Sequence, residues 1–288
     1  AKRVVADAQK ARVDAAKLQI FADKLQMELS ASSLLAQQEL RNPQQSYQGE
    51  LSEAIELREV GRYKTAQEWL YEFLQDRSDD PEALSLLSQV LLLDKKEAEA
   101  EKALIAAASI NSALPSVYRN QARLLLKQSK PLKALEKAQL GCKESPEDPE
   151  SLLVLASCLG ANRRDLEALP IIEKILKIKS NYAEAYASRA IIKLRAEDKT
   201  GANEDAKIAV SLKPHLAEIW FLLSSLHYQN SKLSDAIEAM RHALENDPNN
   251  AAYMTALGEF LRQDDKASEA ISILKQATEL APEDANVW

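Results

Sequence analysis

One residue type recurs at a fixed interval along most of this chain, and the interval restricts the fold more than any other feature. Alanine occurs at seven positions spaced 34 residues apart: Ala66, Ala100, Ala134, Ala168, Ala202, Ala236 and Ala270. A second column, twelve residues earlier in each unit, holds only small residues: Ala54, Ser88, Ala122, Ala156, Ala190, Ser224 and Gly258. Self-similarity with a period of about 20 to 50 residues is the signature of a repeat architecture.

Within one period, the hydrophobic pattern indicates two amphipathic helices. In the sixth unit, the stretch LAEIWFLLSSLHYQN is followed by the turn SKLSD and then by AIEAMRHALENDPNN. Apolar residues recur at i, i+3, i+4 and i+7 in both stretches, and Pro248 ends the second, because proline cannot continue a helix. The small columns are expected where two helices cross closely. Pro170 departs from the pattern, because it lies early in a second helix and is tolerated only if it falls in the first turn.

The small residue in the first helix, the alanine column and the closing DPNN or APED make the chain resemble the tetratricopeptide repeat family. The resemblance covers seven units: 47–80, 81–114, 115–148, 149–182, 183–216, 217–250 and 251–284. It implies an all-α fold, a right-handed α-solenoid of antiparallel helix pairs in which each unit contacts mainly its neighbours.

Both ends of the chain differ from the seven units. Residues 1–46 carry a heptad seam and a second apolar stripe, which predicts a helical extension that either caps the first repeat or mediates self-association. Residues 285–288 match the start of an eighth unit, so we expect the array to continue beyond Trp288. The last second helix, about residues 267–281, would then leave Ile271, Leu274 and Ala277 uncovered, so we expect it to fray or to be buried against another molecule, including a second copy of the chain.

Composition excludes several classes of function. The net charge is −7 and the pI about 5.3, which argues against nucleic acid as a partner. No apolar run is long enough to span a membrane. There is no glycine-rich phosphate loop and no histidine or cysteine spacing for a metal, so we expect no cofactor, no metal and no catalytic site. With only two cysteines, the cytoplasm is the expected compartment, and the periplasm stays open because the natural N-terminus need not be Ala1.

The resemblance places the candidate binding surface on the concave side, which the first helices of the units line. Transferring the family's groove positions to this sequence predicts a partner-binding set of Arg119, Asn120, Arg123, Lys127, Arg195, Phe221, Leu222 and Tyr228. The four cationic side chains should attract acidic groups, and the aromatic ones should bury apolar anchors. The expected partner is a protein or peptide segment that is acidic and carries one or two large apolar residues.

Three functions remain open at this point. The first is a non-catalytic scaffold that binds a peptide or protein segment in the groove. The second is the substrate-recognition arm of a larger enzyme, such as a glycosyltransferase or a sulfotransferase, whose catalytic domain would lie beyond Trp288. The third is an assembly module that acts through residues 1–46. Fold alone does not choose between them.

Overall fold

The computed structural model describes residues 50–281. The predicted helical extension, residues 1–46, and the start of an eighth unit, residues 285–288, lie outside the described residues. The chain divides into two compact units, residues 1–56 and 57–288, and the packing described below is that of the second unit.

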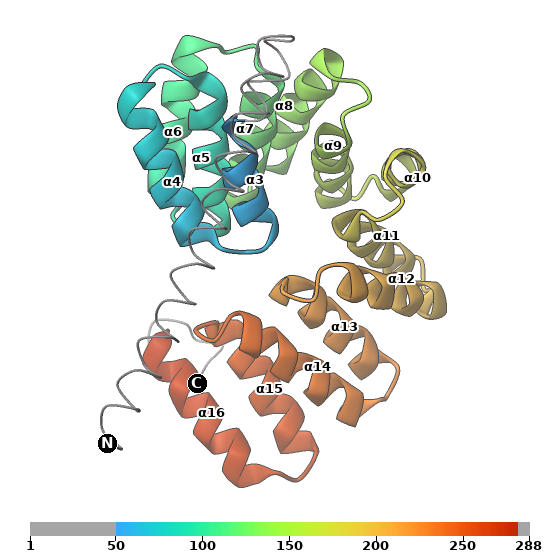
Figure 1. The fold of residues 1–288 in the computed structure, drawn as a ribbon. Coiled ribbons are helices and arrows are strands. Elements are labelled where there is room, and N and C mark those ends of the chain that lie inside the picture. Colours follow the sequence, from blue (N-terminus) through green and yellow to red (C-terminus); the bar gives the residue numbers. More distant parts are fainter. Residues whose placement is uncertain (1–49, 282–288) are drawn as a thin grey trace, which may run out of the picture. The chain divides into compact units, whose positions relative to one another are not determined.

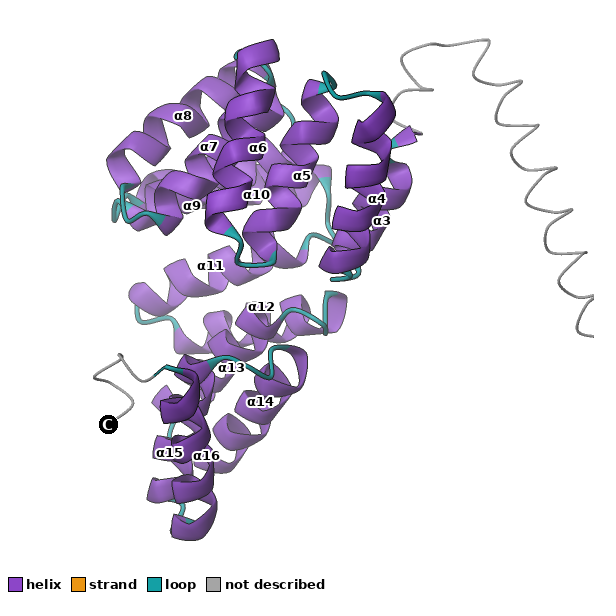
Figure 2. Cartoon of the chain, turned by 90° about the vertical axis from the view of Figure 1, so that its left-hand side faces the viewer, coloured by secondary structure: helices purple, strands orange, loops and turns teal. Residues whose placement is uncertain are grey.

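The described residues form an all-α helical repeat, as the sequence predicts, with fourteen helices that follow one another in pairs (Figures 1 and 2). The first helices of the pairs are α3 (Ser52–Glu59), α5 (Pro81–Leu93), α7 (Pro115–Lys127), α9 (Pro149–Ala161), α11 (Ala183–Arg195), α13 (Ala217–Gln229) and α15 (Ala251–Gln263). The second helices are α4 (Tyr63–Asp76), α6 (Glu97–Ile110), α8 (Pro131–Glu144), α10 (Asp165–Ile178), α12 (Lys199–Leu212), α14 (Leu233–Asn246) and α16 (Ala267–Leu280).

The two small columns occupy the places where helices cross. All seven alanines of the 34-residue column are between 0% and 3% exposed. In the sixth unit, the Ser224 hydroxyl of α13 donates a 2.7 Å hydrogen bond to the carbonyl of Ala236 in α14, so the two columns meet directly. Because the backbones approach this closely, neither position has room for a larger side chain.

Each first helix ends in the same turn, built on one residue with a left-handed backbone. These residues are Gly61, Lys95, Ser129, Arg163, Glu197, Ser231 and Asp265, and their φ angles lie between 57° and 76°. In the third unit, the next amide, that of Lys130, donates to the Leu125 carbonyl at 2.8 Å. This is the Schellman pattern, which satisfies a carbonyl at the helix end and reverses the chain toward the second helix.

Several helices begin with residues that favour a helix N-terminus, namely proline in the first turn or a capping aspartate. Proline occupies the first turn of α5, α7, α8 and α9, and Asp148 caps α9 by accepting from the Ser151 amide at 2.9 Å. Pro170 does not meet the condition of lying in the first turn, because α10 begins at Asp165 and the proline lies further inside the helix. The missing N–H leaves the carbonyl four residues earlier, that of the exposed Leu166, for water.

The last helix pair is better covered than the sequence suggests. In α16, Ala277 is fully buried and packs with Met254 of α15. Leu274 is partly buried beside Gly258, whose missing Cβ would lie 2.5 Å from the leucine. Ile271 and Leu280 are exposed, at 56% and 47%. The expected uncovered face of this helix is therefore narrower than predicted and does not include Ala277.

Candidate functional site

Two of the arginines predicted to line the groove, Arg119 and Arg123, lie in a network of ion pairs inside the array. Arg119 of α7 pairs with Asp148 at 2.7 Å and reaches Glu150 of α9 at 3.7 Å. Arg123, one turn later, contacts the same Glu150 at 3.6 Å. Both arginine side chains are less than a quarter exposed, at 17% and 24%. Their charges are thus partnered within the chain.

A third arginine, not predicted from the sequence, completes this network. Arg58, in the last turn of α3, contacts Glu150 at 3.1 Å and donates to the Gln89 side chain at 2.8 Å. Its side chain is 9% exposed. Glu150 therefore faces three guanidinium groups, which come from the first and third units.

The electrostatics of Glu150 follow from this arrangement. Burial by itself raises the pKa of the carboxyl group, because a charge is poorly solvated inside the protein. The positive charges of Arg123, Arg58 and Arg119 outweigh burial and lower the pKa of Glu150 to about 2. The carboxylate is charged at neutral pH and holds the three arginines in place.

The remaining polar residues of the predicted set differ in their surroundings. Asn120 is 1% exposed and donates to the carbonyl and the hydroxyl of Ser85 in α5, at 2.7 and 3.0 Å, so it joins two repeats rather than facing solvent. Lys127 is exposed at the end of α7. Arg195, at the end of α11, pairs with Asp165 at 2.8 Å and donates to the Gly160 carbonyl at 3.0 Å, with its side chain 33% exposed.

The predicted aromatic residues form an exposed stripe on α13. Phe221 is 37% exposed and stacks on Tyr253 of α15, with the ring centroids 5.1 Å apart. Tyr228, two turns later, is 40% exposed and stacks on Phe260 at 4.7 Å. Its hydroxyl donates to the Gln263 side chain at 3.1 Å. We call Phe221 and Tyr228 the aromatic stripe; each of its rings rests on a buried aromatic ring of the next repeat.

Two further apolar side chains lie near the aromatic stripe in the sequence of first helices: Leu222 on α13 and Ile191 on α11. Leu222 is partly buried and packs against a core cluster that contains Leu223 and Leu226, so it supports the helix more than it faces outward. Ile191 of α11, which the sequence analysis did not single out, is 38% exposed. Its place in the fifth unit is one that lines the groove in the family, and this could have identified it.

Titratable and nucleophilic groups outside this surface show no arrangement for catalysis in the described range. Burial raises the pKa of the Cys142 thiol to about 11 and that of Cys158 to about 12, so both stay protonated and unreactive at neutral pH. Between residues 50 and 281, no three His, Cys, Asp or Glu side chains gather as a metal site would need. No helix in the same range is long and apolar enough to cross a membrane.

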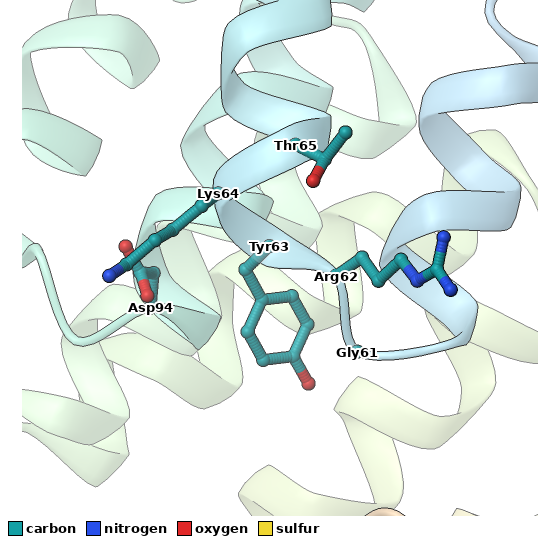
Figure 3. A pocket seen from close by; sticks show the side chains of 6 residues that line it. All are labelled: Gly61, Arg62, Tyr63, Lys64, Thr65 and Asp94. Atoms are coloured by element: carbon teal, nitrogen blue, oxygen red, sulfur yellow. The ribbon is translucent and has the colours of Figure 1, made fainter.

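An open hollow of about 300 Å³ lies at the start of α4 (Figure 3). It is lined by Gly61, Arg62, Tyr63, Lys64, Thr65 and Asp94. Asp94 is already bonded to the Gln67 amide at 2.9 Å and paired with Lys96 at 2.9 Å. The hollow thus offers one partnered carboxylate and solvent-facing cations, which do not form a nucleophile–base pair.

Comparisons with known proteins agree with this geometry. Residues 188–251 and 221–285 match a family model described as tetratricopeptide repeat. No curated protein sequence matches the chain significantly.

Three solved structures show the same type of fold. One, an APC/C hetero-tetramer of Cut9 and Hcn1, has a TM-score of 0.65 at 14% identity, over 83% of this chain and 47% of the other. A thermophilic tetratricopeptide repeat protein of Thermus thermophilus gives 0.57 at 20% identity, over 63% and 99%. A tetratricopeptide repeat protein from Parabacteroides merdae gives 0.56 at 17% identity, over 84% and 96%. At these identities the likeness concerns the fold.

Proposed function

We propose that this chain, which is a tetratricopeptide repeat protein, is a non-catalytic scaffold that binds a protein segment on the first helices of units five to seven. Tetratricopeptide repeats generally mediate protein–protein interaction. The observation that supports placing the binding site on α13 is the aromatic stripe.

The aromatic stripe has the properties of a preformed contact surface. Phe221 and Tyr228 keep more than a third of their surface in water, although the core beneath them is already filled by Tyr253 and Phe260. Stacking on these rings fixes both side chains before a partner arrives, so little conformational entropy is lost on binding. Aromatic residues on a rigid support are the usual energetic centres of protein interfaces.

The two halves of the predicted binding set therefore contribute differently to the proposal. Arg119 and Arg123 are engaged with Glu150, and a ligand would have to compete with that pairing. Arg195, at the end of the first helix that precedes α13, is also paired, with Asp165 at 2.8 Å, but its side chain is 33% exposed and so more accessible than those of Arg119 and Arg123. We therefore propose a segment with one or two large apolar residues over the aromatic stripe and an acidic residue near Arg195, which can pair with a carboxylate.

To test the proposal, a displayed peptide library is screened for binding to the purified chain. The dissociation constants of the selected peptides are then compared between the natural chain and its variants. We expect enriched peptides to share large apolar residues. Replacing Phe221 and Tyr228 together with Ala should weaken their binding at least about tenfold, since two aromatic anchors are lost. Circular dichroism of the double variant checks that the helices remain.

A matched control uses Tyr71 and Ile105, which are 47% and 64% exposed on the second helices α4 and α6. Replacing both with Ala removes a similar apolar area from another face and should leave binding unchanged. Selected peptides that bind the aromatic-stripe variant as tightly as the natural chain would refute the proposed site.

A further inference from the structure

Two leucines project from one edge of the array without serving its core. Leu132 of α8 is 71% exposed and Leu166 of α10 is 91% exposed. They occupy the same place in the third and fourth units. The corresponding residues of the other units are polar or small: Lys64, Ala98, Thr200, Ser234 and Ser268. The fold therefore does not require leucine at this place, and packing does not explain why two adjacent units have one.

The backbone holds the two leucines side by side and away from the core. Each is the second residue of its helix, directly after a turn closed by a Schellman hydrogen bond. The turns of the two units are joined, because the Asn162 side chain donates to the Pro131 carbonyl at 2.9 Å. Pro131 precedes Leu132, and its ring fixes the start of α8. The leucines thus stand on a rigid edge.

Cationic residues surround the leucines on this edge, which we define as residues 127–133 and 161–167. Five cations lie there: Lys127, Lys130, Lys133, Arg163 and Arg164. The two acidic residues of the edge are both paired, Asp165 with Arg195 and Glu167 with Arg164. The edge has a net charge of +3 within a chain whose net charge is −7. The distant negative charges are screened beyond about 8 Å at physiological salt, so the local charge decides what approaches.

The shape of the edge distinguishes between two kinds of anionic partner. A protein partner that anchors its own apolar side chain on this chain needs an enclosed pocket there. Here the apolar side chains protrude, and the hollow described above lies at the start of α4, in another unit. Protruding leucines among lysines and arginines suit the surface of a lipid bilayer. There, apolar side chains enter the boundary of the acyl chains while cations contact phosphate and carboxylate headgroups.

We propose that this edge of units three and four is a peripheral docking surface for an anionic membrane. Leu132 and Leu166 enter the outer acyl region, and Lys127, Lys130, Lys133 and Arg163 lie at the headgroups. Phe221 and Tyr228 of the aromatic stripe are not part of this surface, whereas Arg195 of the proposed peptide site pairs with its residue Asp165.

The experiment measures co-sedimentation of the whole chain with two kinds of vesicle, pure phosphatidylcholine and phosphatidylcholine with about 30% phosphatidylserine, which is strongly anionic. We expect binding to the anionic vesicles only, and its loss at high salt. Leu132→Ser with Leu166→Ser should lower the partition coefficient about tenfold. Lys127→Glu with Lys133→Glu should lower it about 20-fold or more, since each cation near the surface contributes about fivefold.

Matched controls make the same chemical changes elsewhere. Ile105→Ser with Ile271→Ser removes two exposed apolar side chains from α6 and α16, and Lys102→Glu with Lys275→Glu changes the net charge by the same amount. Binding that both edge variants lose and both controls keep supports the proposal. Any other pattern overturns it, including no binding by the natural chain, equal binding to uncharged vesicles, or binding that the edge variants retain.

Discussion

The turn after each first helix shows how one backbone angle is maintained while the side chain changes. Gly61 adopts the left-handed conformation in the first unit, and six residues with side chains adopt it in the others. A left-handed residue with a Cβ costs about 1 kcal/mol, because the Cβ approaches the following carbonyl. Only glycine avoids this cost, so six of the seven turns store a small strain.

Replacing Glu197, whose φ is 64°, with Gly should therefore stabilise the chain by up to about 1 kcal/mol. The gain is reduced, though not cancelled, by the extra freedom of glycine in the unfolded chain. Denaturant unfolding measures it. The matched change Glu204→Gly, in the interior of α12, should instead destabilise by about 1 kcal/mol. A loss of stability for both variants would contradict the left-handed turn.

Glu150 supports a second prediction at this scale. Its pKa in the folded chain is about 2, below the value of about 4.3 expected in the unfolded chain. A lowered pKa means that the stabilisation is present above the unfolded value and is lost as the pH falls toward the folded one. Replacing Glu150 with Gln should destabilise the fold by about 2–3 kcal/mol at neutral pH, and the difference from the natural chain should shrink toward pH 2.

Thermal or denaturant unfolding across this pH range tests the role of Glu150. The control is Glu101→Gln, on the exposed face of α6, for which we expect no change. A Glu150→Gln difference that is the same at pH 7 and near pH 2 would show that shape, and not charge, makes this residue important.

At the scale of the element, the sequence predicted most of what the structure contains. The helix pairs, the turns and the buried alanines follow from a 34-residue period, because the same pattern of apolar and small residues occurs seven times. The sequence left the turn that holds Pro170 open, because a periodic pattern does not show where in a helix the proline falls. The aromatic residues of α13 were predicted to be exposed, but the supporting rings on α15, Tyr253 and Phe260, were not recognised as their partners.

The alanine column gives the prediction that belongs to the helix pair. Replacing Ala134 or Ala236 with Leu should destabilise the chain by about 1–3 kcal/mol, since both positions are fully buried where two helices cross. Ala98→Leu, on the exposed face of α6, adds the same side chain without a neighbour to displace and should change stability by less than about 0.5 kcal/mol. The unfolding midpoints of the three variants test this prediction. Equal midpoints would show that the alanine column does not lie where the two helices cross.

At the scale of the whole array, contacts between distant repeats are what sequence analysis did not predict. Lys213, before α13, pairs with Glu59 at the end of α3 and with Glu184 of α11. Lys95, in the turn before α6, pairs with Asp247 at 2.6 Å across 152 residues. A 34-residue period describes neighbouring units only, whereas these contacts depend on small rotations that add up from unit to unit.

Contacts within the chain, mostly between neighbouring units, explain why only half of the predicted binding set stays exposed. Arg119 and Arg123 of the third unit contact Glu150 of the fourth, and Arg58 of the first unit reaches the same carboxylate. The first helices of units five to seven carry the exposed aromatic stripe. Binding in this account is therefore concentrated near the C-terminal end of the described array.

Hydrogen–deuterium exchange of the chain, with and without a selected peptide, locates the bound surface. We expect the peptide to slow exchange in α13 and α15, residues 217–229 and 251–263, and to leave exchange in α7, residues 115–127, unchanged. Slowed exchange in α7, or in the second helices α14 and α16 without α13, would contradict it.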